Sequence, residues 1–181
     1  ILRAGKWLKF NEDYLEALDA AVRQIEVEET EAALQDLSMS EPEFNQAMVA
    51  YGYEVADTDF DILRTAGRTS TEAWDLSRED TVYAVKFGTA QKLNYVVDQA
   101  NSVVEILQNS AQRGEKPQIK RYCLWLGYEA KKLPQSLAES GSIILKQKVE
   151  AWSRHCLSAG ITPVLKLSRK ITSRTIDALG T

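Results

Sequence analysis

Cysteine and histidine are scarce in this sequence, and their scarcity removes several kinds of chemistry. The 181 residues include only Cys123, Cys156 and His155 of these two types. A zinc site needs about four ligands, and two isolated cysteines outside any CxxC pair do not supply them. We therefore expect two buried thiols in a reducing compartment, the cytoplasm.

A nucleophilic pair of the Ser-His or Cys-His type would have to use His155, the single histidine. Its neighbour Cys156 points about 100° away from it on a helix, so the two side chains are poorly placed to act together. The histidine is therefore expected at the surface or at the end of a helix.

Long apolar runs are also missing. No stretch approaches the roughly 20 apolar residues that a membrane-spanning helix needs, and the first residues carry no signal peptide. The sequence therefore predicts no membrane partner. It begins at Ile1 and not at Met, which leads us to expect a fragment of a longer polypeptide, with the remainder of that polypeptide among its partners.

Basic residues are rare in the first part of the chain, and acidic residues are rare in the second. The net charge of −4 hides this split, because residues 1–109 hold 9 Lys and Arg against 21 Asp and Glu, whereas residues 110–181 hold 13 against 5. Such asymmetry suggests a face for a polyanion. The alternative is internal: the acidic helices expected at 11–25 and 41–50 would neutralise the cations within one fold.

Hydrophobic periodicity predicts an α/β domain. A capping box at Ser40 opens one helix, and β-branched and aromatic residues mark the strands. We divide the chain into residues 1–39, a strand, a helix and an acidic linker at 26–39, and residues 40–181, the α/β domain with a basic tail from 168. The predicted helices are 11–25, 40–52, 89–109 and 142–158, and the predicted strands are 62–64, 72–76, 82–87, 122–128 and 161–167.

The predicted order of helix, three strands, long helix and strand resembles the core of the PD-(D/E)XK, or restriction-endonuclease-like, superfamily. The resemblance implies carboxylates that hold Mg²⁺ and a lysine that helps to activate the attacking water. Asp75 falls on the second of the three strands and Lys86 on the third, and Glu43 matches an acid often found on the first helix. The resemblance therefore implies that Asp75, Lys86, Glu72 and Glu43 are catalytic candidates, with Asp75 and Glu43 as metal ligands.

One position departs from the superfamily pattern. The residue two before Lys86 should be Glu or Asp, and it is Ala84, so a metal would lose a central ligand. Glu72 could compensate, but it lies three positions from Asp75, and side chains at that spacing point to opposite faces of a regular strand. Each residue also has a structural alternative to a catalytic role: Lys86 could end a strand in solvent, and Asp75 could cap the following turn.

A second resemblance covers most of the chain. It rests on four segments: Gly5-Lys6-Trp7, Glu43-Phe44-Asn45, Glu72-Ala73-Trp74-Asp75-Leu76 and Val82-Tyr83-Ala84-Val85-Lys86. These segments resemble landmarks of a sporadically distributed bacterial family of unknown function, whose members are longer than this chain. The patchy occurrence of that family is similar to that of mobile-element and phage-defence genes. The resemblance implies a context and no established catalytic residue.

The sequence predicts a mixed central sheet flanked by helices and leaves three functions open. The first is a nuclease-like, degenerate domain that binds DNA or RNA, and the second is an active Mg²⁺-dependent nuclease. The third is a module that assembles with a partner protein or a second copy. Ala84 favours the first function, and the retained Asp75 and Lys86 favour the second. The cations expected to contact nucleic acid are Lys120, Arg121, Lys166, Arg169 and Lys170.

Overall fold

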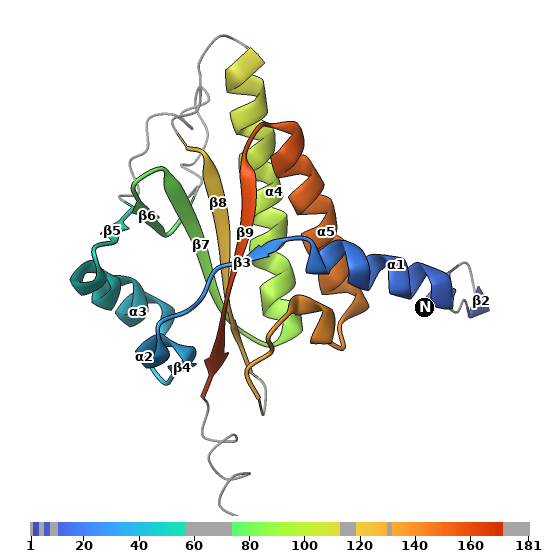
Figure 1. The fold of residues 1–181 in the computed structure, drawn as a ribbon, viewed down its shortest axis with the longest axis horizontal. Coiled ribbons are helices and arrows are strands. Elements are labelled where there is room, and N and C mark those ends of the chain that lie inside the picture. The colour runs from blue at the N-terminus through green and yellow to red at the C-terminus, as the bar shows by residue number, and fades with distance from the viewer. Residues whose placement is uncertain are drawn as a thin grey trace, which may run out of the picture.

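The computed structural model describes residues 2–3, 6–7, 11–56, 74–112, 119–129 and 132–171. Residues 2–3 and 6–7 pair as a small two-stranded sheet, and the other described strands form one large mixed sheet with helices on both of its faces (Figure 1). The predicted fold class, an α/β fold with a mixed central sheet flanked by helices, is confirmed.

From Thr81 onward, long strands alternate with helices along the chain. The helices and strands are β1 (Leu2–Arg3), β2 (Lys6–Trp7), α1 (Glu12–Arg23), β3 (Glu26–Val27), α2 (Ala32–Gln35), β4 (Asp36–Leu37), α3 (Glu41–Met48), the 3-10 helix η1 (Val49–Tyr51), β5 (Glu54–Val55), β6 (Leu76–Arg78), β7 (Thr81–Gly88), α4 (Ala90–Gln112), β8 (Arg121–Tyr128), the 3-10 helix η3 (Leu137–Glu139), α5 (Ile143–Ser158) and β9 (Thr162–Lys170).

Three long parallel strands form the middle of the sheet. The described strands are ordered β3-β9-β8-β7-β6-β5, and β4 also pairs with β9. Thr81 of β7 is in register with Arg121 of β8, which is in register with Thr162 of β9. On the outer side of β7, β6 and β5 continue the sheet with antiparallel pairing. On the outer side of β9, β3 and β4 each form parallel pairs with β9.

Helices α4 and α5 lie on the same face of the sheet. Helix α4 connects β7 to its parallel neighbour β8, and α5 connects β8 to β9. Because such connections are right-handed and both step in the same direction along the sheet, the two helices lie on the same face. Figure 1 shows α4 and α5 together on one side of the sheet, with α2 and α3 on the other. The helices predicted at 89–109 and 142–158 pack on a sheet that contains the strands predicted at 82–87 and 122–128, as expected. Of the third strand expected in that sheet, at 72–76, residues 72 and 73 lie outside the described residues.

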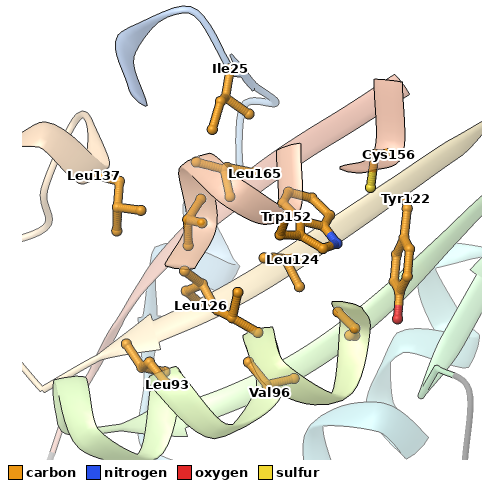
Figure 2. Packing of buried hydrophobic residues seen from close by; sticks show 14 of the residues in the cluster. Ile25, Leu93, Val96, Tyr122, Leu124, Leu126, Leu137, Trp152, Cys156 and Leu165 are labelled. Atoms are coloured by element: carbon orange, nitrogen blue, oxygen red, sulfur yellow. The ribbon is translucent and has the colours of Figure 1, made fainter. Parts of the chain in front are cut away.

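The larger hydrophobic core lies between the sheet and helices α1, α4 and α5 (Figure 2). Alternate strand residues such as Leu124 and Leu126 enter this core, because successive side chains on a strand point to opposite faces. Trp152 of α5 is buried there with its ring edge-on to Tyr122, at a centroid distance of 5.8 Å. Such a pair contributes about 0.5–1.5 kcal/mol beyond the burial of its area.

A smaller core on the opposite face is mainly aromatic. The ring centroid of Phe44 on α3 lies 5.0 Å from that of Phe87 and 4.8 Å from that of Trp125, edge-on in both cases. Phe87 is in register with Gly127 of β8, and its ring occupies the space where a side chain at position 127 would begin. These contacts fix α3 against the second half of β7.

The segment interpreted as a linker is part of the sheet, so that interpretation is wrong. Residues 26–39 contain β3, α2 and β4, and both strands pair with β9. Between the two strands, the Thr30 hydroxyl donates to the Leu167 carbonyl at 3.0 Å, and the Ser168 hydroxyl donates to the Leu34 carbonyl at 2.8 Å. Two-residue strands have no alternation that a sequence pattern could reveal.

The antiparallel part of the sheet also differs from prediction. The strand predicted at 72–76 is β6, which begins only at Leu76 because the chain bends at Asp75. The third antiparallel strand is β5, which was not predicted, and the predicted strand at 62–64 lies outside the described residues. β9 runs on to Lys170, so the first residues of the predicted basic tail are strand.

No helix within the described ranges could cross a membrane. α4 has the length, with 23 residues, but Asp98 and Glu105 are among the polar residues on its exposed side.

Candidate functional site

β7 has an open edge beyond the end of its antiparallel neighbour. Among the described residues, β6 pairs with β7 from Thr81 to Tyr83. Farther along β7, the N–H of Val85 donates to Asp75 Oδ2 at 2.7 Å, and the N–H of Phe87 donates to Glu41 Oε1 at 2.9 Å. Two carboxylates thus accept the hydrogen bonds that a neighbouring strand would otherwise accept. We call Glu41, Asp75 and residues 85–87 the β7 edge cluster.

Lys86 supplies the positive charge of the β7 edge cluster. Its Nζ lies 2.7 Å from Glu41 Oε2, so consecutive residues of β7 bind the two oxygens of one carboxylate. The Lys86 and Glu41 side chains are 29% and 28% exposed. The pair is therefore accessible to solvent and to a ligand.

Asp75 is held at the edge by its own backbone. Its N–H donates to the Tyr83 carbonyl at 2.9 Å, and its carbonyl accepts from the N–H of Ala56 at 3.0 Å. The chain is thereby fixed to β7 on one side and to the end of β5 on the other. This places the carboxylate beside Val85. Asp75 was predicted on the second antiparallel strand, but it lies in the bend just before β6.

Glu41, and not Glu43, joins these two residues. Glu43 Oε2 accepts from the N–H and from the hydroxyl of Ser40, both at 2.8 Å, in the predicted capping box. These bonds hold the pKa of Glu43 below its ordinary value. Side chains two apart on a helix differ by about 200° in direction, so Glu43 is directed away from the cluster. The sequence could have indicated Glu41, because the first turn of α3 contains two acids and the capping box uses only Glu43.

The position of the missing acid is an apolar core position. Ala84 is 4% exposed and lies in the larger core, where a carboxylate would be costly without a partner. Within the described residues, no group of three or more His, Cys, Asp or Glu side chains is arranged to hold a metal. Glu72, the suggested substitute, lies outside those residues.

Lys166 is the most deeply buried of the predicted nucleic-acid contacts, with 1% of its surface exposed. Its Nζ lies 3.0 Å from the Tyr53 hydroxyl and 4.5 Å from the centre of the Trp125 ring. Glu28 Oε1 and Glu31 Oε2 are 3.2 Å and 3.4 Å away. Burial alone lowers the pKa of Lys166, but the hydroxyl and the two carboxylates outweigh it and the pKa is raised. The buried ammonium is therefore charged and internally bound.

The other four predicted cations have internal partners near the surface. Lys120 Nζ lies 3.0 Å from Asp80, Arg121 Nη2 lies 2.6 Å from Glu26, Arg169 binds both oxygens of Asp36 at 2.6 Å, and Lys170 Nζ donates to the carbonyls of Ser38 and Met39 at 2.8 Å and 2.6 Å. Lys120 is the most exposed of them, at 80%.

The charge split of the sequence is thus met by pairing inside the fold. Four of the five cations pair with acids in residues 26–39 or with Asp80, and Lys170 binds backbone carbonyls of the same segment. The internal alternative is supported: these acids lie mostly in the supposed linker, and Lys146 of the basic part also pairs with Asp19 in the helix predicted at 11–25. Binding of nucleic acid by these cations stays a prediction.

Replacing Asp36 by Asn is expected to remove a pH-dependent contribution to stability of about 0.2–1 kcal/mol, the usual range for a solvent-accessible pair. The hydrogen bonds from Arg169 lower the pKa of Asp36. A carboxyl pKa lowered by folding stabilises the fold above the unfolded value of about 3.9, and this stabilisation is lost as the pH falls through the folded value. Urea denaturation should separate wild type from variant at neutral pH and not at about pH 2. An equal difference at both pH values would contradict this assignment.

The thiols and the histidine lie where the sequence predicts them. Cys123 and Cys156 are free and buried, and burial raises the pKa of Cys156 to about 12. The pKa of Cys123 is raised farther, first by burial and then by the charge of Glu28. His155 is in the last turn of α5, with Nε2 3.0 Å from Gln108 Oε1. Neither thiol is placed to act as a nucleophile.

The β7 edge cluster, with Asp75, Lys86 and Glu41, is the candidate site that the described residues offer. No protein-family model matches the chain, and no curated protein and no solved structure is significantly similar to it.

Proposed function

We propose that this chain is a nuclease-like domain that binds the phosphate backbone of DNA or RNA at the β7 edge cluster and cleaves it weakly or not at all. One observation carries the proposal. The carboxylates of Asp75, in the bend before β6, and of Glu41, in α3, bind Val85, Lys86 and Phe87, three consecutive residues of β7. An acid and a lysine on adjoining parts of such a sheet are what the resemblance to the PD-(D/E)XK superfamily implies.

The donors of the cluster suit a phosphate group. Lys86 Nζ is charged and accessible, and the N–H groups of Val85 and Phe87 lie on the same open edge. Charge-assisted hydrogen bonds from an ammonium and from backbone N–H groups to phosphate oxygens are strong and independent of base sequence. We therefore expect binding that positions a nucleic-acid backbone without reading its bases.

Magnesium fits the same residues poorly. Mg²⁺ prefers about six oxygen ligands in octahedral geometry, whereas the cluster offers the carboxylates of Glu41 and Asp75, each of which already accepts a backbone N–H. Ala84 adds no third carboxylate. An active Mg²⁺-dependent nuclease is therefore the less favoured alternative.

A module that assembles with proteins and does not bind nucleic acid is the second candidate. The observation in its favour is the internal pairing of all five predicted cations, including the buried Lys166. In that case a partner chain, a second copy or the remainder of the polypeptide would be what the domain contacts. The buried free thiols support a cytoplasmic location for either function.

Incubation of the chain with plasmid, single-stranded DNA and RNA in Mg²⁺ or Mn²⁺ is expected to give little or no cleavage. The same preparation should bind these nucleic acids in a gel-shift or anisotropy assay, with an affinity that falls steeply as salt is raised. Lys86→Ala should weaken binding and change Tm only slightly, because the Lys86 side chain and its ion pair with Glu41 are partly exposed.

Robust cleavage that disappears in both Asp75→Ala and Lys86→Ala would show that the domain is an active nuclease. Absence of salt-sensitive binding to every nucleic acid would instead favour the assembly module.

A further inference from the structure

We infer that Glu41 is an exchangeable internal ligand of an anion site formed by Lys86 Nζ and the Phe87 N–H, and that a phosphate group replaces it when it binds. The inference deepens the proposed function and rests on it, because it names the group that the β7 edge cluster recognises and the residue that competes with it.

The geometry is that of a two-point anion contact. Lys86 Nζ lies 2.7 Å from Glu41 Oε2, and the Phe87 N–H donates to Glu41 Oε1 at 2.9 Å. One charged donor and one backbone donor thus converge on the two oxygens of a single anionic group. Two oxygens of a phosphate present a similar pair of acceptors to such donors.

Release of Glu41 from this site is expected to cost little. The pair is partly exposed on both sides, and ion pairs open to solvent are only weakly held. Glu41 is in the first turn of α3, where the helix dipole favours a carboxylate whether or not it contacts Lys86. The occupant can therefore turn into solvent while α3 stays in place.

Lys166 shows what a non-exchangeable site of the same charge looks like in this fold. It is 1% exposed, and its partners Tyr53, Glu28 and Glu31 surround it on the sheet face. The contrast in exposure indicates that an outside anion can reach Lys86 but not Lys166.

A peptide strand is the other ligand that an open β edge could accept. It would use the N–H groups of Val85 and Phe87 in place of the two carboxylates that accept from them. It would leave the charge of Lys86 without an anion, because backbone carbonyls are neutral. A phosphate satisfies the lysine and the backbone donor together, so it matches this site better than a peptide strand does.

The test is a titration of the full chain, without divalent metal, with inorganic phosphate and with a single-stranded oligonucleotide. Glu41→Gln keeps the shape of the side chain and an acceptor for Phe87, but it removes the competing charge. We expect it to bind phosphate about fivefold more tightly than wild type, because the site is then free in a larger fraction of molecules. Lys86→Ala should abolish phosphate binding in both backgrounds.

Glu43→Gln is the matched control. It removes one negative charge from the same helical turn, but Glu43 is bound to Ser40 and does not contact Lys86. Its phosphate affinity should equal that of wild type. Circular dichroism melting curves for all variants would show that each of them is folded.

The outcomes separate the inference from the proposed function. Equal tightening by Glu41→Gln and Glu43→Gln, or no phosphate binding by any variant, would overturn the inference. Nucleic-acid binding that neither Glu41→Gln nor Lys86→Ala changes would leave the proposed binding activity standing and overturn this site. Phosphate binding that responds as expected, without affinity for any nucleic acid, would support the anion site and overturn the proposed function.

Discussion

Lys166→Glu is expected to destabilise the domain by about 3–5 kcal/mol, the usual cost of leaving a buried charge without its partner. The new carboxylate would lie beside Glu28 and Glu31 in a site where the native side chain is 1% exposed. It would also lose the contact of the ammonium with the Trp125 ring. For a domain of this size the change corresponds to a fall in Tm of roughly 6–20 °C.

Two variants make this prediction specific. Lys166→Met keeps an unbranched side chain against Trp125 but removes the charge, and Glu28 retains Arg121 at 3.6 Å. Its cost should be smaller than that of Lys166→Glu. Lys120→Glu reverses the same charge on a side chain that is 80% exposed, where substitutions usually change stability by less than about 0.5 kcal/mol.

Thermal melting followed by nucleic-acid binding distinguishes the two roles of Lys166. If Lys166 binds its acidic neighbours, Tm falls in the order Lys120→Glu, Lys166→Met, Lys166→Glu, with the last variant the least stable. If Lys166→Glu kept the wild-type Tm and lost affinity for DNA or RNA, Lys166 would be a contact residue and the internal assignment would be wrong.

Gly127→Ala is expected to be the most damaging replacement by a single methyl group, with a cost of about 1–3 kcal/mol. A Cβ at this position would lie 2.2 Å from Cδ1 of Phe87 and within 3 Å of two further ring carbons. Phe87 is 5% exposed and packs on Phe44, so its ring has no free space to move into. Denaturant titration of the variant measures the cost directly.

A second glycine and a double variant test the cause. A Cβ at Gly141 would have no atom within 4 Å, so Gly141→Ala should be close to neutral. Phe87→Leu in the Gly127→Ala background should recover part of the loss, because the smaller side chain vacates the space. If the two changes were simply additive, the contact with Phe87 would not be the reason.

The long elements could be predicted because their patterns repeat many times. α4 and α5 show helical spacing of apolar residues, and the apolar runs of β7 and β8 mark buried strands. β3, β4 and β5 have two residues each, too few for any period. Their pairing depends on tertiary contacts with β9 and β6, which no local pattern contains.

The candidate site could be predicted only in part, for a similar reason. Asp75 and Lys86 are close in sequence and belong to one hairpin, so their proximity follows from local structure. Glu41 reaches Lys86 across 45 residues, and the choice between Glu41 and Glu43 depends on which acid binds Ser40. The orientation of α3 on the sheet directs Glu41, and not Glu43, toward Lys86. The resemblance to the PD-(D/E)XK superfamily had indicated Glu43.

The pairing of residues 26–39 with β9 has a consequence for the order in which the protein is made. The hydrogen bond between Thr30 and Leu167 joins residues 137 positions apart, so a chain synthesised from its N-terminus carries this segment without its strand partner until the end of β9 has been made. During that interval an uncharged segment with strand-forming ends would be prone to pair with other chains. Residues 26–39 contain five acids and no Lys or Arg, and mutual repulsion keeps such segments apart. We therefore expect this acidity to limit association with other chains until β9 has been made. Lys166 and Arg169 of β9 then pair with Glu28, Glu31 and Asp36, which lowers the repulsion when the strands pair.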